Sequence, residues 1–81
     1  MALVKVYSTP TCPWCRKAKE FLDELGVDYE DVDVSADREA AMRMVRATKQ
    51  MGVPVVEVNG KFVVGFDPNG IKGLLVEEGL L

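Results

Sequence analysis

The stretch "LVKVYSTPTCPWCRKAKEFL", residues 3–22, places both cysteines of the chain between two different hydrophobic periods. Residues 3–8 alternate apolar and polar side chains and are rich in β-branched and aromatic residues, which is typical of a strand. From Pro13 the period becomes helical, because one face collects Trp14, Ala18, Phe21, Leu22 and Leu25. Pro13 suits a first helical turn, and Gly26 stands where a C-terminal cap belongs. The pattern predicts a strand, a cysteine loop and a helix in succession.

The next two segments repeat this order of strand and helix. Residues 27–34, "VDYEDVDV", alternate again, with a slip in the pattern that predicts a bulge near Asp31. Ser35 is the predicted cap of a helix over residues 36–49, and Asp37 and Glu39 favour its first turn. The apolar face of that helix consists of Ala41, Met44, Val45 and Thr48.

The C-terminal part predicts a hairpin followed by a helix. Residues 53–58, "VPVVEV", and residues 61–66, "KFVVGF", flank Asn59-Gly60, a dipeptide that readily takes the positive φ angles of a tight turn. The two strands are therefore expected to pair antiparallel. Beyond them, Ile71, Leu74 and Leu75 have helical spacing, which predicts a short helix over residues 68–77.

The order β-α-β-α-β-β-α predicts an α/β fold in a single domain, residues 1–81, with a four-stranded mixed sheet flanked by helices. A strand, crossover helix and strand favour parallel pairing, and the hairpin completes the sheet. The predicted core includes Leu3, Val4, Val6, Phe21, Leu22, Leu25, Val32, Val34, Val45, Val55, Val56, Val58, Phe62 and Val64.

Composition narrows the class of protein. Hydrophobic residues make up 48% of the chain and charged residues 28%, with a formal net charge of -3, which is typical of a globular protein. Lys and Arg do not gather into a stripe that would follow phosphates, so we expect no nucleic-acid partner. The apolar runs are too short to span a membrane, and the start lacks a secretory signal pattern. We expect a cytoplasmic monomer.

The cysteine pair indicates redox chemistry. A bridge between Cys12 and Cys15 would enclose only two residues, so it would restrict the unfolded chain very little. Cys12 precedes a helix whose first N–H groups favour a thiolate, with Arg16 and Lys17 adding positive charge. Cys15 follows within one turn and is placed to attack a mixed disulfide formed by Cys12. Pro13 stiffens the loop, and Trp14 presents an apolar face beside it.

Other interpretations of the pair are open. Two cysteines at this spacing also occur as small buried hydrophobic residues. A closed zinc site needs four ligands, whereas the chain has two cysteines and no histidine. The alternative from another class is a dimeric metal-binding or iron-sulfur module in which two chains share ligands.

A second element, "MGVPVV" at residues 51–56, opens a strand with Pro54. Proline in this position is ordinarily an edge or turn residue. With a cis Val53-Pro54 bond, the backbone of Val53 would approach the cysteines and pair with an extended substrate. The sequence leaves the isomer open.

The strand, "TCPWC", the helix and then "GVPVVEVNGKFVVGF" together resemble the glutaredoxin branch of the thioredoxin fold over nearly the whole chain. The resemblance implies a thioredoxin-like fold and a thiol-disulfide oxidoreductase that reduces protein disulfides, with Cys12 attacking and Cys15 resolving. It also implies a redox-active Cys12-Cys15 disulfide, no bound cofactor or metal, and a cis-proline at Pro54. The loop would be lined by Tyr7, Thr11, Pro13 and Trp14.

Two electron sources fit the resemblance. Glutathione-using members usually carry a basic residue before the first cysteine, where this chain has "STPT", and a Gly-Gly pair where it has Gly65-Phe66. The stretch "VGFDPNGI" is more similar to NrdH-redoxins, which implies thioredoxin reductase as donor and ribonucleotide reductase as acceptor. Glutathione stays open because Gln50 matches a glutathione-side residue and Asp67 suits an ammonium. The expected substrate-binding residues are Gln50, Met51, Gly52, Val53, Pro54, Gly65, Phe66 and Asp67.

Overall fold

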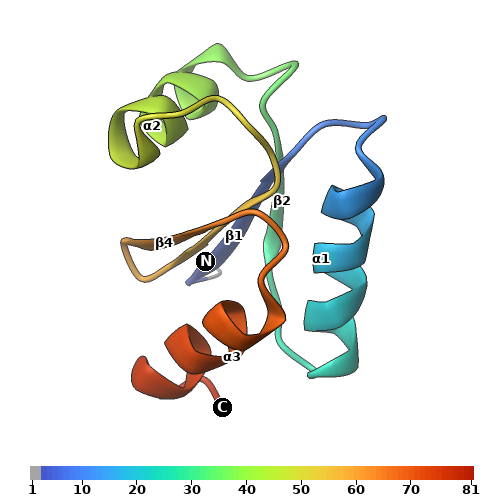
Figure 1. Ribbon diagram of the computed structural model, residues 1–81, viewed down its shortest axis with the longest axis vertical. Helices are drawn as coiled ribbons and strands as arrows, with labels where there is room; N and C mark the ends of the chain where they lie inside the picture. Colours follow the sequence, from blue (N-terminus) through green and yellow to red (C-terminus); the bar gives the residue numbers. More distant parts are fainter. Residues whose placement is uncertain (1–2) are drawn as a thin grey trace.

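The computed structural model describes residues 3–81, and its elements follow the predicted order. The strands are β1 (Val4–Ser8), β2 (Glu30–Asp33), β3 (Val55–Val58) and β4 (Lys61–Val64), and the helices are α1 (Pro13–Glu24), α2 (Arg38–Thr48) and α3 (Pro68–Glu77). Figure 1 shows α1 running alongside β2, and β4 lying between α2 and α3. The bounds of α3 are those that the sequence predicts.

The strands form one mixed sheet in the order β2-β1-β3-β4 within the described residues. β1 pairs with β2 in parallel and with β3 antiparallel, and β3 pairs with β4 antiparallel. The hairpin turns at Asn59 and Gly60, which have φ angles of 49° and 84° as the dipeptide predicted. This arrangement confirms the predicted four-stranded mixed sheet and its thioredoxin-like topology.

Helices cover both faces of the sheet. Successive side chains of β1 point to opposite faces, so this strand contributes to both core layers. Val4 and Val6 pack with Leu22 of α1 and with Ile71 and Leu75 of α3. Tyr7 and Val55 pack on the other face, against Ala40 and Met44 of α2. The cysteine loop leaves the end of β1 between these layers, so both layers position it.

The predicted bulge near Asp31 is wrong. β2 pairs with β1 residue by residue, from Lys5 with Glu30 to Ser8 with Asp33. The slip in the apolar pattern has another cause: Val27 and Tyr29 pack with the α1 and α3 layer, whereas Val32 and Val34 pack with the α2 layer. A segment that contributes to two layers loses strict alternation without inserting a residue.

The start of α2 differs from the prediction, and α1 starts at Pro13 as predicted but with a different buried face. Asp37, not Ser35, caps α2, and its carboxylate accepts a hydrogen bond from the Ala40 amide at 3.0 Å. Ser35 instead donates its backbone N–H to the carboxylate of Asp33. In α1 the buried face begins at Cys15 and not at Trp14, which is 56% exposed.

Leu3 and Val64 were expected in the core but are 55% and 50% exposed. Leu3 precedes β1, and Val64 ends the edge strand β4, so neither lies under a helix. The other predicted core positions are buried or pack against the two core layers. In the described part of the chain, no helix has the length and apolar character needed to cross a membrane.

Candidate functional site

Cys12 occupies the N-cap of α1, with the extended backbone angles φ -91° and ψ 112°. Its amide donates to the Thr9 carbonyl at 3.3 Å, which closes the loop after β1. The Cys12 Sγ atom accepts a hydrogen bond from the Cys15 amide at 3.2 Å. N–H groups at a helix start have no partner within the helix, and they stabilise negative charge. The sulfur of Cys12 therefore lies at a helix start, with a backbone N–H directed at it.

Cys15 has a different environment, since it is only 1% exposed, whereas Cys12 is partly exposed. Burial raises the pKa of the Cys15 thiol to about 11, and its hydrogen bond with Cys12 acts in the same direction. Both sulfurs are free thiols. The pair thus combines an accessible sulfur with a buried one that holds its proton.

The Val53-Pro54 peptide bond is cis, which answers the question that the sequence left open. The carbonyl oxygen of Val53 lies 3.9 Å from the Cys12 Sγ atom, so this loop and the cysteine loop meet. Gln50 braces the approach to it: its Nε2 donates to the Gly52 carbonyl at 3.1 Å, and its Oε1 accepts from the Gly52 amide at 2.6 Å. The Gln50 amide is therefore engaged with its own chain.

A groove of about 310 Å³ opens beside Cys12, lined by Trp14, Val53, Pro54, Gly65 and Phe66. Trp14 stacks on Phe66 with ring centroids 6.1 Å apart. The Gly65 amide donates to the Pro54 carbonyl at 2.8 Å, and the φ angle of Gly65 is +81°. The residues that line the groove are apolar, which suits an extended chain carrying an apolar side chain.

The rim of the groove is exposed. The Lys17 ammonium lies 5.6 Å from the centroid of the Trp14 ring, within the range of a cation-π contact. Met51, two residues before Val53, is 80% exposed. Thr11, Pro13 and Arg16 are also exposed, so they surround the cysteines without being buried by them.

Of the predicted substrate-binding residues, Val53, Pro54, Gly65 and Phe66 line the groove, whereas Gln50, Met51, Gly52 and Asp67 do not. The side chains of Tyr7 and Asp67 have other partners. Tyr7 is fully buried on the α2 face, and its hydroxyl donates to a Glu57 carboxylate oxygen at 2.5 Å, so the expectation that it lines the cysteine loop is corrected. Asp67 caps α3, where its carboxylate accepts from the Gly70 amide at 3.1 Å. The side chain of Asp67 thus has a structural partner.

Sequence reasoning missed a polar network behind the cysteines. The Ser8 hydroxyl donates to Asp31 Oδ1 at 2.7 Å, and the Lys19 ammonium donates to Asp31 Oδ2 at 2.9 Å. Lys19 follows Cys15 by four residues on α1. That spacing puts both side chains on one face of a helix, which is the signal that would have pointed to Lys19.

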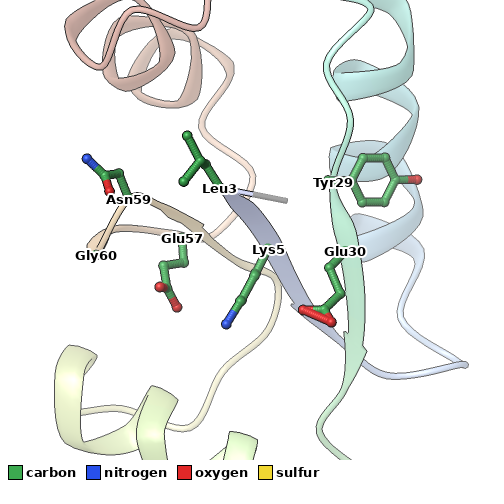
Figure 2. A pocket seen from close by; sticks show the side chains of 7 residues that line it. All are labelled: Leu3, Lys5, Tyr29, Glu30, Glu57, Asn59 and Gly60. Atoms are coloured by element: carbon green, nitrogen blue, oxygen red, sulfur yellow. The ribbon is translucent and has the colours of Figure 1, made fainter. Parts of the chain in front are cut away.

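A larger hollow lies at the other end of β1. Its volume is about 570 Å³, and it is lined by Leu3, Lys5, Tyr29, Glu30, Glu57, Asn59 and Gly60. Figure 2 shows Lys5 between Glu30 and Glu57, its partners on the neighbouring strands. No cysteine lines this hollow. Within residues 3–81, no group of three or more His, Cys, Asp or Glu side chains is arranged to hold a metal ion.

The fold, the cysteine pair at a helix start and the cis-proline opposite it define a protein of the thioredoxin-fold class. Residues 4–63 match the family model described as Glutaredoxin, and the chain belongs to the glutaredoxin family. Membership supports a thiol-disulfide oxidoreductase.

Individual relatives agree with this assignment. A glutaredoxin-like 8.6 kDa protein in a rubredoxin operon of Clostridium pasteurianum is 44% identical over 73 residues, covering 90% of this chain and 97% of that protein. The crystal structure of a glutaredoxin from Archaeoglobus fulgidus is 30% identical with a TM-score of 0.84, covering 93% of this chain and 87% of its own. The glutaredoxin-like NrdH-redoxin from Escherichia coli is 30% identical with a TM-score of 0.78, covering 88% and 92%.

Proposed function

We propose that this protein is a dithiol electron carrier that reduces protein disulfides through Cys12 and Cys15. The Cys12 thiolate attacks one sulfur of the substrate disulfide, and the other substrate sulfur leaves as a thiol. Cys15 then attacks Cys12 Sγ, which forms the Cys12-Cys15 disulfide and releases the second substrate thiol. No organic cofactor or metal enters this cycle.

The observation that carries the proposal is the contrast between the two sulfurs. Cys12 Sγ accepts a helix-start N–H at 3.2 Å and is partly exposed, so a substrate disulfide can reach it. Cys15 is buried directly behind it and holds its proton, because burial raises the pKa of its thiol to about 11. This arrangement favours attack by Cys12 and reserves Cys15 for the intramolecular step.

The groove supports a protein disulfide over glutathione. Phe66 fills one wall and stacks on Trp14, which leaves an apolar strip along the cis-proline. Gln50 and Asp67, two of the polar groups that favoured glutathione, make hydrogen bonds to Gly52 and Gly70. A tripeptide rich in charge would lose its water along this strip, whose lining residues carry no charge.

We therefore propose thioredoxin reductase as the electron donor. The NrdH-redoxin from Escherichia coli, to which this chain is similar, is described as having a thioredoxin-like activity profile. Ribonucleotide reductase is the acceptor that this similarity implies, and it is the first protein disulfide to test. A carrier of this kind works where thiols are kept reduced, so we propose a cytoplasmic location.

The test is NADPH oxidation by the purified protein with a protein disulfide as terminal acceptor. One mixture contains thioredoxin reductase, and a parallel one contains glutathione and glutathione reductase. We expect turnover in the first mixture and little in the second. Turnover in the glutathione mixture alone would contradict the proposed donor while leaving the dithiol chemistry intact.

Two variants test the roles of the cysteines in the same assay. Cys12→Ser is expected to abolish turnover, because the remaining thiol is buried. Cys15→Ser is expected to accumulate a mixed disulfide between Cys12 and the substrate protein, visible by mass spectrometry under non-reducing conditions. Full turnover by Cys12→Ser would overturn the assignment of the attacking sulfur.

A further inference from the structure

Resolution by Cys15 poses a problem that the site above does not solve. Cys15 is buried, and burial raises the pKa of its thiol to about 11, yet it must become a thiolate to attack. Two groups act in the opposite direction and favour the thiolate, the backbone N–H of Thr9 and the ammonium of Lys19. The following inference rests on the dithiol cycle proposed above.

Lys19 is held in place by a network that reaches into the core. Among the described residues, Ser8 is the polar side chain buried in the core, and its hydroxyl donates to Asp31 Oδ1 at 2.7 Å. The other carboxylate oxygen of Asp31 accepts from the Lys19 ammonium at 2.9 Å. Burial opposes the charge on Asp31, but the hydrogen bonds from Ser8 and Lys19 prevail and lower its pKa. Asp31 therefore stays ionised at neutral pH.

The fold places the network of Ser8, Asp31 and Lys19 next to Cys15. Lys19 is one helical turn beyond Cys15 on α1, a spacing at which Cβ atoms are about 5–6 Å apart. Ser8 ends β1 directly before Thr9, whose amide favours the Cys15 thiolate. α1 runs alongside β2, which carries Asp31 (Figure 1). One carboxylate thus ties together the strand end and the helix turn that flank the buried sulfur.

We propose that Asp31, anchored by Ser8, is a positioning residue that holds the Lys19 ammonium beside Cys15 and so promotes the resolving step. The charged and titratable groups around this site are Cys12, Lys19 and Asp23 on α1, and Asp31 and Tyr29 from the β2 segment. Lys19 is the one cation among them. A half-exposed ion pair contributes little to stability, so its position beside the sulfur is the more informative feature.

The chemical step balances with the groups named. Cys15 loses its proton to water, and the thiolate attacks Cys12 Sγ of the mixed disulfide. A sulfur-sulfur bond forms between the two cysteines as the bond from Cys12 to the substrate breaks. The substrate sulfur leaves with the bonding electron pair and takes up a proton from water. Lys19 takes no part in these bond changes and acts only through its charge.

The experiment separates the two steps in a single turnover. Reduced protein is mixed with excess 5,5′-dithiobis(2-nitrobenzoate) in a stopped-flow instrument. Attack by Cys12 releases a first thionitrobenzoate, and attack by Cys15 on the mixed disulfide releases a second. The rate of the second release is followed as a function of pH in wild type, Lys19→Gln, Lys19→Arg and Asp31→Asn. Lys61→Gln, which breaks the ion pairs of Lys61 on β4 with Glu77 and Glu78, is the control.

We expect Lys19→Gln to move the midpoint of the second phase upward by about one pH unit. Such a shift lowers the thiolate fraction about tenfold at neutral pH, and the more basic thiolate regains about threefold in nucleophilicity, so the net slowing is about threefold. Asp31→Asn is expected to move the midpoint in the same direction, because the ammonium is released into solvent. Lys19→Arg keeps the charge and is expected to restore the wild-type profile, and Lys61→Gln to leave it unchanged.

Three results are informative in different ways. A midpoint that moves downward in Asp31→Asn would mean that Asp31 acts only as a negative charge, which overturns the positioning role. If the second release occurred in wild type and had the same pH profile in Lys19→Gln, this inference would be overturned. The dithiol cycle would still stand. A wild type that releases only the first thionitrobenzoate would overturn the proposed function itself.

Discussion

The indole of Trp14 stacks on the phenyl ring of Phe66, although Trp14 belongs to the first turn of α1 and Phe66 to the segment before α3. Phe66 is fixed from behind by Phe21, whose ring meets it edge-on at 6.1 Å between centroids. Trp14, by contrast, is more than half exposed, and its second partner is the mobile side chain of Lys17, whose ammonium lies 5.6 Å from the ring centroid. The stack therefore has an anchored ring and an accessible one, and the accessible ring flanks Cys12.

The first prediction concerns Trp14. We expect Trp14→Ala to raise the KM for a protein disulfide about fivefold with kcat nearly unchanged, because the lost contact, worth about 1 kcal/mol, binds the substrate without touching the reacting sulfurs. Trp14→Phe keeps a ring on Phe66 and is the control, with kinetics close to wild type. Steady-state rates with thioredoxin reductase and one protein disulfide measure both. An equal fall of kcat in Trp14→Ala would instead assign the ring to the chemical step.

The second prediction is selective alkylation. Because the pKa of Cys15 is raised to about 11, mainly by burial, its thiolate is scarce at pH 8, and the sulfur is also shielded from solvent. Iodoacetamide at pH 8 is therefore expected to modify Cys12 and spare Cys15 in the folded, reduced protein. Peptide mass spectrometry identifies the labelled residue. The same reaction in concentrated urea, where both residues label, is the control, and equal labelling without urea would contradict the burial of Cys15.

Most of the fold was predictable because its signals are local. The Asn59-Gly60 turn, the helical period after Pro13 and the Pro68 start each reflect the preference of a few neighbouring residues. The failures occurred where two layers compete for one segment, as in residues 27–34, which supply side chains to both faces of the sheet. The predicted cap of α2 also failed, since Ser35 and Asp37 are both good caps and only the path of the chain selects Asp37.

The site was predictable to the extent that chemistry follows spacing along the chain. The cysteine pair, Pro54 and the Phe66 segment stand out by residue type, and the structure brings them to one groove. The partners of Gln50 and Asp67 could not be predicted, because the sequence does not show whether a polar side chain will hydrogen-bond to a nearby backbone amide. Asp31 was missed since its partners lie on β1 and α1, and only the parallel pairing of β1 with β2 brings them together.

The third prediction separates capping from ligand binding at Asp67. The carboxylate accepts from the Gly70 amide, so Asp67→Ala is expected to lower the free energy of unfolding by about 1 kcal/mol. Asp67→Ser removes the charge but keeps a capping oxygen, so its free energy of unfolding is expected to fall much less. Urea unfolding followed by circular dichroism measures both. If Asp67→Ser matched wild type in stability but lost glutathione-dependent turnover, the residue would bind glutathione after all.

The last prediction concerns Tyr7, whose pKa is raised from 10.0 to about 12, first by burial and then by its hydrogen bond to Glu57. Between these pH values the unfolded chain loses this proton and the folded chain keeps it. The contribution of the neutral Tyr7 hydroxyl to the free energy of unfolding is therefore fully present below pH 10. It falls as the pH rises toward 12, by up to about 1.4 kcal/mol per pH unit. Cys15, whose pKa is raised from 9.0 to about 11, gives a similar loss that begins one unit lower.

Tyr7→Phe isolates the contribution of Tyr7 to this alkaline loss. At pH 7 the variant is expected to be less stable by about 1–2 kcal/mol, because Glu57 loses its donor. Its stability is expected to decline less steeply than that of wild type above pH 10, so that the two curves converge near pH 12. Tyr29→Phe is the control, since no hydrogen bond of the Tyr29 hydroxyl occurs within residues 3–81, and its cost at pH 7 is expected to be small. Urea unfolding at pH 7, 10 and 11.5 gives the curves, and parallel slopes for wild type and Tyr7→Phe would show that the Tyr7 proton is not linked to folding.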